Sequence, residues 1–389
     1  MSHAPSAALS RRHQAVRDAL HVLELDALVV TSLPNVLYLT NFTGSSAIVV
    51  IDATKLSFVT DFRYVTALAG TRGTAHECPG LEVITVEGSY DAALAERLSA
   101  GSARRIGFEA AHLTVARHDW LQSTLTNQST ISGQQSAIGS PIELVPTEGV
   151  VERLRVRKDD YEIATLREAA RRLSELAPAV IGDVRRGRTE RDLALAIDWR
   201  IRQAGFERSA FDTIVASGPN SALPHARPGE RTITEGDLVV LDFGGVYDSY
   251  CVDLTRTVSV GRADDRVREV YEAVREARTR GVAAVAPGRS RFEIDAAARD
   301  TLASHGLGDA FGHGTGHGLG IEVHEDPRIT RRRNDIDTQD EAVAPGMVFT
   351  IEPGAYLPGW GGVRIEDDVL VTETGVELLT NAGTELIEI

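Results

Sequence analysis

Uninterrupted apolar runs alternate with amphipathic stretches along the first third of the chain. The apolar runs predict buried strands at residues 27–31, 47–51, 56–60, 81–86 and 106–108. Apolar residues recur at helical spacing in residues 11–25, 34–38 and 90–98, which predicts helices between the strands. Strands that alternate with helices are typical of an α/β domain, which we expect over residues 1–150.

The pattern changes after about residue 150. Long amphipathic helices are predicted at residues 159–177, 189–204, 266–278 and 290–304, and two of them start with the spacing of a capping box (Asp159 with Glu162, Ser290 with Glu293). Hairpin-like strands are predicted at residues 213–217, 238–244, 250–257 and within 347–371. Antiparallel strands with flanking helices indicate an α+β domain over residues 151–389.

The first predicted hairpin carries two aspartates. We place its tip near Tyr247 and Asp248, among turn-forming residues. Asp242 and Asp253 are then about equally far from the tip, on one face of the hairpin, where like charges destabilise each other. A divalent cation between them would offset this repulsion. The alternative is a different register, which leaves one aspartate elsewhere.

A second hairpin, residues 349–354 with 363–368, carries Glu352 and Glu366 at about equal distances from its centre. We hypothesise that the two acidic hairpins arose by duplication and lie side by side. Four carboxylates and one imidazole sum to about −4, a charge that a buried cluster retains only when cations offset it. Two divalent ions would do so, as in two-metal hydrolases.

A glycine-rich run at residues 311–325 contributes His313, His317 and His324. Its glycines permit close backbone approach, and a neutral histidine is a common metal ligand, although any one of them could be purely structural. The run does not indicate a nucleotide site, because no strand-to-helix unit and no nearby basic residue accompany its glycines. One nitrogen among oxygen ligands favours Mn²⁺, Co²⁺ or Fe²⁺, permits Zn²⁺ and argues against structural zinc.

Composition excludes several classes of function. The net charge of −15 disfavours nucleic acid or an anionic membrane as a partner. No apolar run is long enough to span a membrane, and the first residues lack the apolar core of a secretory signal. Two cysteines are too few for a disulfide framework, which favours a soluble protein of the reducing cytoplasm.

Taken together, the motifs resemble those of the pita-bread metallopeptidases, in particular the branch of Xaa-Pro dipeptidase (prolidase) and aminopeptidase P. The resemblance covers residues from about 155 to the end and rests on residues 241–244, 252–257, 313–324, 350–354 and 364–368. Residues 38–42 and 60–64 also resemble the additional N-terminal domain of that branch, which methionine aminopeptidases usually lack. The stretch from Arg331 to Glu341 departs from the pattern, because relatives tend to be shorter there.

The resemblance implies a role for each site residue. Asp242 would hold one metal, Asp253 and Glu366 would bridge two, and His317 and Glu352 would complete the second. Glu352 would also carry the proton, and Arg364 would support the site. Substrate contacts are expected from His225, His324, His313 and Arg328, the last of these with the carboxylate of a substrate proline. Relatives suggest a homodimer, and the ligand types favour Mn²⁺ or Co²⁺ as the bound ions.

The function that follows is hydrolysis of small peptides with proline at the second position, and we expect a dipeptidase. The first alternative is an aminopeptidase P that acts on longer peptides. Two further alternatives are a metal-free creatinase-like hydrolase and a catalytically inactive binding module. Both lack the full ligand set in known cases, whereas all five ligands are present here.

Overall fold

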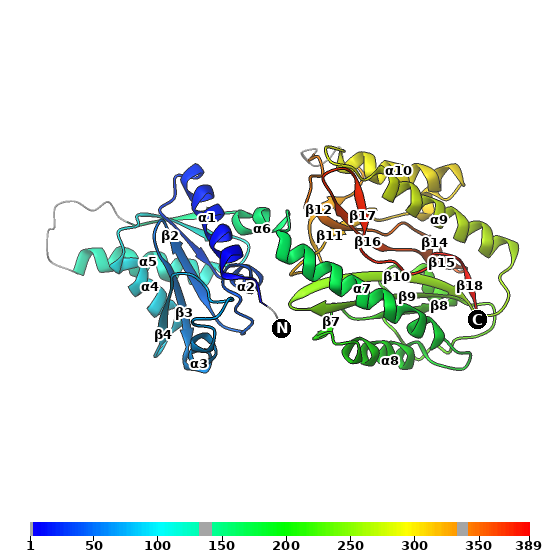
Figure 1. The fold of residues 1–389 in the computed structure, drawn as a ribbon, viewed down its shortest axis with the longest axis horizontal. Coiled ribbons are helices and arrows are strands. Elements are labelled where there is room, and N and C mark those ends of the chain that lie inside the picture. Colours follow the sequence, from blue (N-terminus) through cyan, green and yellow to red (C-terminus); the bar gives the residue numbers. More distant parts are fainter. Residues whose placement is uncertain (1–2, 132–141, 333–340) are drawn as a thin grey trace. The chain divides into compact units, whose positions relative to one another are not determined.

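The computed structural model describes residues 3–131, 142–332 and 341–389. The chain divides into two compact units, Met1–Arg155 and Val156–Ile389 (Figure 1). Most of the stretch from Arg331 to Glu341, residues 333–340, lies outside the described residues. No helix in the described ranges combines the length and the hydropathy that a membrane span requires.

The N-terminal unit is an α/β domain, as predicted. Its six-stranded sheet has the order β4-β3-β2-β1-β5-β6, in which β2 alone runs antiparallel to its neighbours. The strands are β1 (Ala27–Val30), β2 (Ile48–Asp52), β3 (Leu56–Asp61), β4 (Leu81–Val86), β5 (Arg105–Glu109) and β6 (Glu143–Thr147). The helices are α1 (Ser6–Val22), α2 (Leu33–Thr40), α3 (Phe62–Gly70), α4 (Tyr90–Ala100), α5 (Val115–Ile131) and α6 (Val150–Arg155).

Four elements of this unit were not predicted, namely α3, α5, α6 and β6. Helix α3 buries none of its residues and is only nine residues long, so it lies below the length at which periodicity identifies a helix. Strand β6 is a sheet edge that contains Pro146, a residue that disfavours strand assignment. The five predicted strands are all present, within two residues of the expected ends.

The C-terminal unit is an α+β domain, and this prediction is also confirmed. One sheet has the order β18-β10-β9-β7, with β8 also paired to β9; a second has the order β12-β11-β13-β16-β17, and β14 pairs with β15. The strands are β7 (Arg208–Ser209), β8 (Ile214–Ser217), β9 (Leu238–Tyr247), β10 (Tyr250–Ser259), β11 (Gly316–Gly318), β12 (Glu325–Ile329), β13 (Val348–Ile351), β14 (Gly354–Leu357), β15 (Gly361–Arg364), β16 (Asp367–Val371), β17 (Val376–Leu378) and β18 (Ile387–Glu388).

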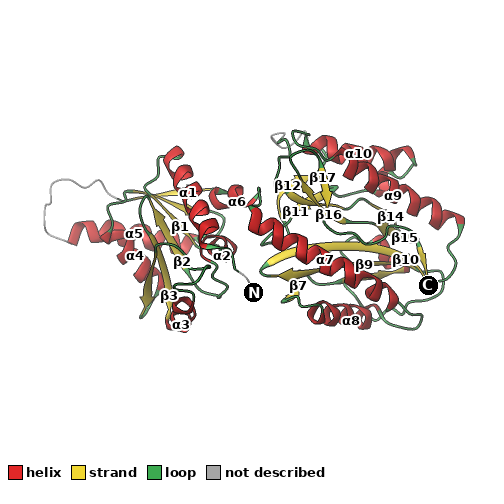
Figure 2. Cartoon of the chain, viewed as in Figure 1, coloured by secondary structure: helices red, strands yellow, loops and turns green. Residues whose placement is uncertain are grey.

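Long helices flank these strands. They are α7 (Asp160–Gly182), α8 (Glu190–Gln203), α9 (Asp265–Ala284) and α10 (Arg291–Ser304). Helices α9 and α10 run along one side of the strands and α8 along the opposite side (Figure 2). Both predicted capping boxes are present, at the starts of α7 and α10. Apolar residues of α9 and α10 pack against β15, around Val274, Leu302 and Val363.

Candidate metal centre

The first acidic hairpin is a continuous ladder of β9 and β10. Asp248 and Ser249 form its two-residue turn, and both have the positive φ of a hairpin turn (47° and 70°). Asp242 therefore pairs with Thr255, and Asp253 pairs with Gly244. The expected register was wrong by two residues, because the tip lies one residue later than predicted. The two aspartates still share one face of the hairpin, as diagonal and not as directly opposed neighbours.

The second acidic hairpin is interrupted at its glutamates. Strand β13 pairs with β16 up to Ile351 and Asp367, and pairing resumes between Gly354 of β14 and Arg364 of β15 in the same register. Glu352 and Glu366 thus lie opposite each other in the gap, as predicted. Their backbone N–H groups donate outside the hairpin, to the carbonyls of Thr315 (2.7 Å) and Thr255 (3.1 Å) respectively.

His317 lies in β11 between two close backbone contacts. A Cβ atom on Gly316 would lie 1.8 Å from the carbonyl oxygen of Thr350, and one on Gly318 would lie 2.2 Å from that of Asp326, so both positions require glycine. The ring nitrogen Nδ1 of His317 contacts the carbonyl of Gly318 at 3.1 Å. Its other nitrogen, Nε2, lies 3.5 Å from Oε1 of Glu352.

Three of the predicted ligands converge tightly. One ligand atom from each of Asp253, His317 and Glu366 lies within 4.8 Å of the others. Asp242 is another of the predicted ligands. Its carboxylate oxygen Oδ1 is buried and has no hydrogen-bond partner among the described residues. A buried carboxylate oxygen without a donor is costly, and a cation satisfies it. The residues present therefore fit a divalent cation.

Burial sets the electrostatics of this cluster. Burial raises the pKa of Asp253 well above its ordinary range, and the neighbouring Glu366 raises it further. Burial likewise raises the pKa of Glu366, and the neighbouring Glu352 adds to that effect. Burial also raises the pKa of Glu352 to about 7. It lowers the pKa of His317 to about 3, with His324 adding to the effect, so His317 is neutral and able to ligate near neutral pH.

Arg364 links the cluster to a residue that sequence reasoning missed. Its guanidinium donates to Oδ2 of Asp242 and, at 2.9 Å, to the hydroxyl of Tyr356. The same hydroxyl lies 2.9 Å from Nε2 of His313. Thr255 was also missed, although its hydroxyl donates to Glu366 and accepts from Nε of Arg364 at 3.2 Å. A polar hydroxyl within a buried strand was the available signal for both.

A cavity of about 530 Å³ opens onto the cluster. His324 and Arg328 form part of its wall: the rings of His317 and His324 have centroids 4.4 Å apart, and Arg328 pairs with His317 across the β11–β12 ladder. Apolar wall is supplied by Phe211, Ile214 and Val323. The cavity brings together every site residue proposed from the sequence, namely Asp242, Asp253, His317, Glu352, Glu366, His225, His313, His324, Arg328 and Arg364.

Known proteins resemble the chain over both units. The model of metallopeptidase family M24 matches residues 164–373, and that of the creatinase/prolidase N-terminal domain matches residues 12–157. A peptidase of Bacillus subtilis named YqhT, whose function is uncharacterised, is 40% identical over 374 residues, which are 96% of this chain and 99% of that protein.

Solved structures show the same likeness. An Xaa-Pro dipeptidase from Bacillus anthracis superposes with a TM-score of 0.88 at 36% identity, over 98% of this chain and 100% of that one. An X-Pro aminopeptidase from Thermotoga maritima superposes with a TM-score of 0.83 at 30% identity, over 96% of this chain and 100% of that one. The chain is an enzyme that belongs to metallopeptidase family M24, as its motifs predict.

Proposed function

We propose that the enzyme hydrolyses the peptide bond before proline, with two divalent cations held by Asp242, Asp253, His317, Glu352 and Glu366. The observation that carries this proposal is the convergence of these side chains at one cavity, with a buried carboxylate oxygen of Asp242 left without a donor. Asp253 and Glu366 are the proposed bridging ligands, because they are the carboxylates in the tightest part of the cluster and each has two oxygens with which it would hold two cations. Mostly oxygen ligands with one nitrogen favour Mn²⁺ or Co²⁺ and permit Zn²⁺ or Fe²⁺.

Divalent cations, when bound, supply an activated water near neutral pH and polarise the substrate carbonyl. Glu352 is the group proposed to move the proton, because its carboxylate lines the cavity beside the other proposed ligands. His225 and His324, on the cavity wall, are proposed to donate N–H groups to the developing oxyanion. The nitrogen of the departing proline receives the proton. Arg364 holds Asp242 and Tyr356 in place.

We further propose that dipeptides are the preferred substrates. Arg328 supports this proposal, because it is exposed, lines the cavity and pairs with His317 on the adjacent strand. A guanidinium there is placed to bind the carboxylate of a C-terminal proline bidentately. A longer peptide has an amide at that position, which is a weaker partner. The similarity to an X-Pro aminopeptidase keeps the longer-peptide activity as the second candidate.

A substrate panel tests both proposals. The Mn²⁺-loaded enzyme should cleave Xaa-Pro faster than Xaa-Pro-Xaa, and Arg328→Ala should raise KM for Xaa-Pro by about 10- to 100-fold, the contribution of a hydrogen bond to a charged group. Cleavage of Xaa-Pro-Xaa should change much less. Arg331→Ala, an exposed arginine three residues further on, is the matched control and should leave both substrates unaffected. Faster cleavage of tripeptides by the wild type would favour the aminopeptidase.

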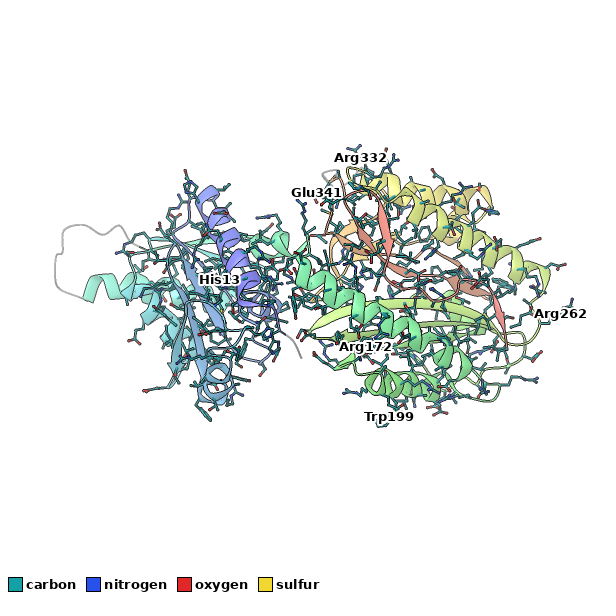
Figure 3. All side chains as sticks on the ribbon, in the orientation of Figure 1. His13, Arg172, Trp199, Arg262, Arg332 and Glu341 are labelled. Carbon is teal, nitrogen blue, oxygen red and sulfur yellow. The ribbon has the colours of Figure 1, made fainter. Side chains whose placement is uncertain are left out.

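We assign residues 151–389 to catalysis and residues 1–150 to an N-terminal domain, and we propose a cytoplasmic homodimer. Two free, buried cysteines support the reducing compartment. Leu195 and Trp199, four residues apart on α8 and each more than 60% exposed, support an association surface; Trp199 extends away from the helix in Figure 3. Light scattering of wild type and Trp199→Ser tests the dimer.

A further inference from the structure

A buried ion pair lies beside the proposed substrate-contacting His324. Nζ of Lys158 is 3.1 Å from Oε2 of Glu325, and the two side chains are only 1% and 7% exposed. Glu325 directly follows His324, whereas Lys158 precedes helix α7, far away in the sequence. Of the 41 Lys and Arg residues in the chain only Lys55 and Lys158 are lysines, and Lys55 pairs with Glu82 at an exposed site.

Glu325 closes the turn that contains His324. Its Oε1 accepts the backbone N–H of Glu322 at 2.9 Å, so one carboxylate binds both Lys158 and the start of the turn. Glu325 also pairs with Gly318 in the β11–β12 ladder, next to His317. A Cβ atom on Gly320 would lie 3.0 Å from both carboxylate oxygens and from Cε of Lys158, which shows how closely the pair packs on the loop.

The same loop is fixed on its other side by strand β10. The backbone N–H of Cys251 donates to the carbonyl of Gly320 at 2.6 Å, and its thiol donates to that of Ile321 at 3.6 Å. Lys158 is itself anchored, because its N–H donates to the carbonyl of Gly346 at 2.8 Å. Residues 319–325 are therefore held between β10, which carries Asp253, and an ammonium group on a fixed backbone.

We propose that the Lys158–Glu325 ion pair is a positioning device for the catalytic site: it fixes the turn of residues 322–325 and thereby the orientation of the His324 ring toward the substrate. The proposal rests on the role given to His324 under the proposed function. Both charges are nearly excluded from water, so each holds the other firmly. Because the turn is closed by this carboxylate, the backbone of His324 has little conformational freedom. Misplacement of a catalytic group by about 1 Å can cost about 100-fold in rate.

Lys158→Met tests the proposal in the full-length, Mn²⁺-loaded enzyme. We expect kcat/KM for an Xaa-Pro dipeptide to fall about 10- to 100-fold with the metal content unchanged. Lys55→Met, the same substitution at the exposed lysine, is the matched control and should change nothing. Because Lys158→Met takes the ammonium group away from the buried carboxylate of Glu325, the double variant Lys158→Met/Glu325→Gln removes both charges at similar volume. Wild-type activity in either folded variant would overturn the proposal.

A cycle with His324→Ala separates positioning from general destabilisation. If the pair acts through His324, Lys158→Met should lower kcat/KM by less than about threefold in the His324→Ala background, because coupled residues are not additive. The same 10- to 100-fold fall in both backgrounds would overturn positioning and leave the proposed function intact. A fully active His324→Ala variant would instead contradict the role of His324 itself, and the positioning proposal with it.

Discussion

The two acidic hairpins of the C-terminal unit place their carboxylates in different ways. In the first, β9 and β10 pair without a break from Leu238 with Ser259 to Tyr247 with Tyr250, and Asp242 and Asp253 are ordinary members of that ladder. In the second, pairing stops after Ile351 with Asp367 and resumes at Gly354 with Arg364. Glu352 and Glu366 lie in the interruption, next to Pro353, which has no N–H to give to a ladder.

The two glutamates join the separate parts of the site. They face each other at a position of the hairpin whose N–H groups point outward, because opposed pairs of an antiparallel hairpin alternate between bonding each other and bonding outside. These N–H groups bind Thr315, which leads into the His317 strand, and Thr255 of the first hairpin. The first hairpin thus supplies a rigid base, and the second connects that base to the histidine. Substitutions that act on one hairpin or on the link between them test this view.

The largest effect is expected from Asp253→Ala, in the rigid hairpin. Asp253 lies in the tightest ligand group, so its loss should weaken both proposed cations and lower kcat by at least about 10³-fold, in keeping with the several kcal/mol that metal ions contribute. Metal analysis together with kinetics checks this prediction. Asp265→Ala, an exposed aspartate in the first turn of α9, serves as the control. Two bound ions in a folded Asp253→Ala variant would contradict the bridging role.

The architecture of this rigid base could be predicted almost entirely from sequence. The apolar run at residues 238–244 and the turn residues after it define the hairpin, and alternation places Asp242 and Asp253 on one face. The register could not be fixed to the residue, because several turn-forming residues are adjacent and only backbone geometry selects Asp248 and Ser249. Because the predicted tip was one residue too early, the predicted partner of each residue was wrong by two positions.

The connections between segments were much less accessible. Tyr356 and Thr255 contribute hydroxyl groups to the site, but serine, threonine and tyrosine occur in strands for many reasons, and only the fold brings these two to Arg364. The Lys158–Glu325 pair joins residues 167 positions apart, which no periodicity reveals. Residue types and local spacing thus predict ligands and strands, while hydrogen bonds between distant segments depend on tertiary structure.

The next effect concerns Glu352, in the interrupted hairpin. In metal-free protein burial raises its pKa from 4.5 to about 7, so between these values the folded chain binds a proton that the unfolded chain has released. The free energy of unfolding should therefore fall as pH rises, by about 1.4 kcal/mol per pH unit and about 3 kcal/mol in all. Glu352→Gln removes this proton, so the variant should gain stability relative to wild type between pH 4.5 and 7.

Urea unfolding of both proteins after chelation, at several pH values, measures the difference. Subtraction of the variant cancels the contributions of the buried histidines, which act in the opposite direction below pH 6.5. Below pH 4.5, where Glu352 is protonated in both states, the difference should be flat. Saturating Mn²⁺ is the control, because a cation replaces the proton and should abolish the trend in wild type. Parallel pH profiles for the two metal-free proteins would contradict the raised pKa of Glu352.

The smallest effect is expected from the link between the hairpins, where two buried threonines of β10 offer a matched pair. Thr255 contacts the carboxylate of Glu366 and Nε of Arg364, whereas Thr257 contacts only backbone, the carbonyl (2.9 Å) and N–H (3.1 Å) of Arg364. Valine removes the hydroxyl at similar volume in both cases. Thr255→Val should lower kcat/KM about 10- to 100-fold, as for groups that support metal ligands.

Thr257→Val should instead cost stability, about 1–3 kcal/mol for the backbone groups of Arg364 left without partners, with kcat/KM changed by less than about threefold. Kinetics and denaturant unfolding on the two variants separate these outcomes. If both variants lost activity equally, the interruption would matter only as a packing feature. A loss confined to Thr255→Val would show that the hairpins cooperate through the side chains of Glu366 and Arg364, because Thr257→Val removes only a link to the backbone of Arg364.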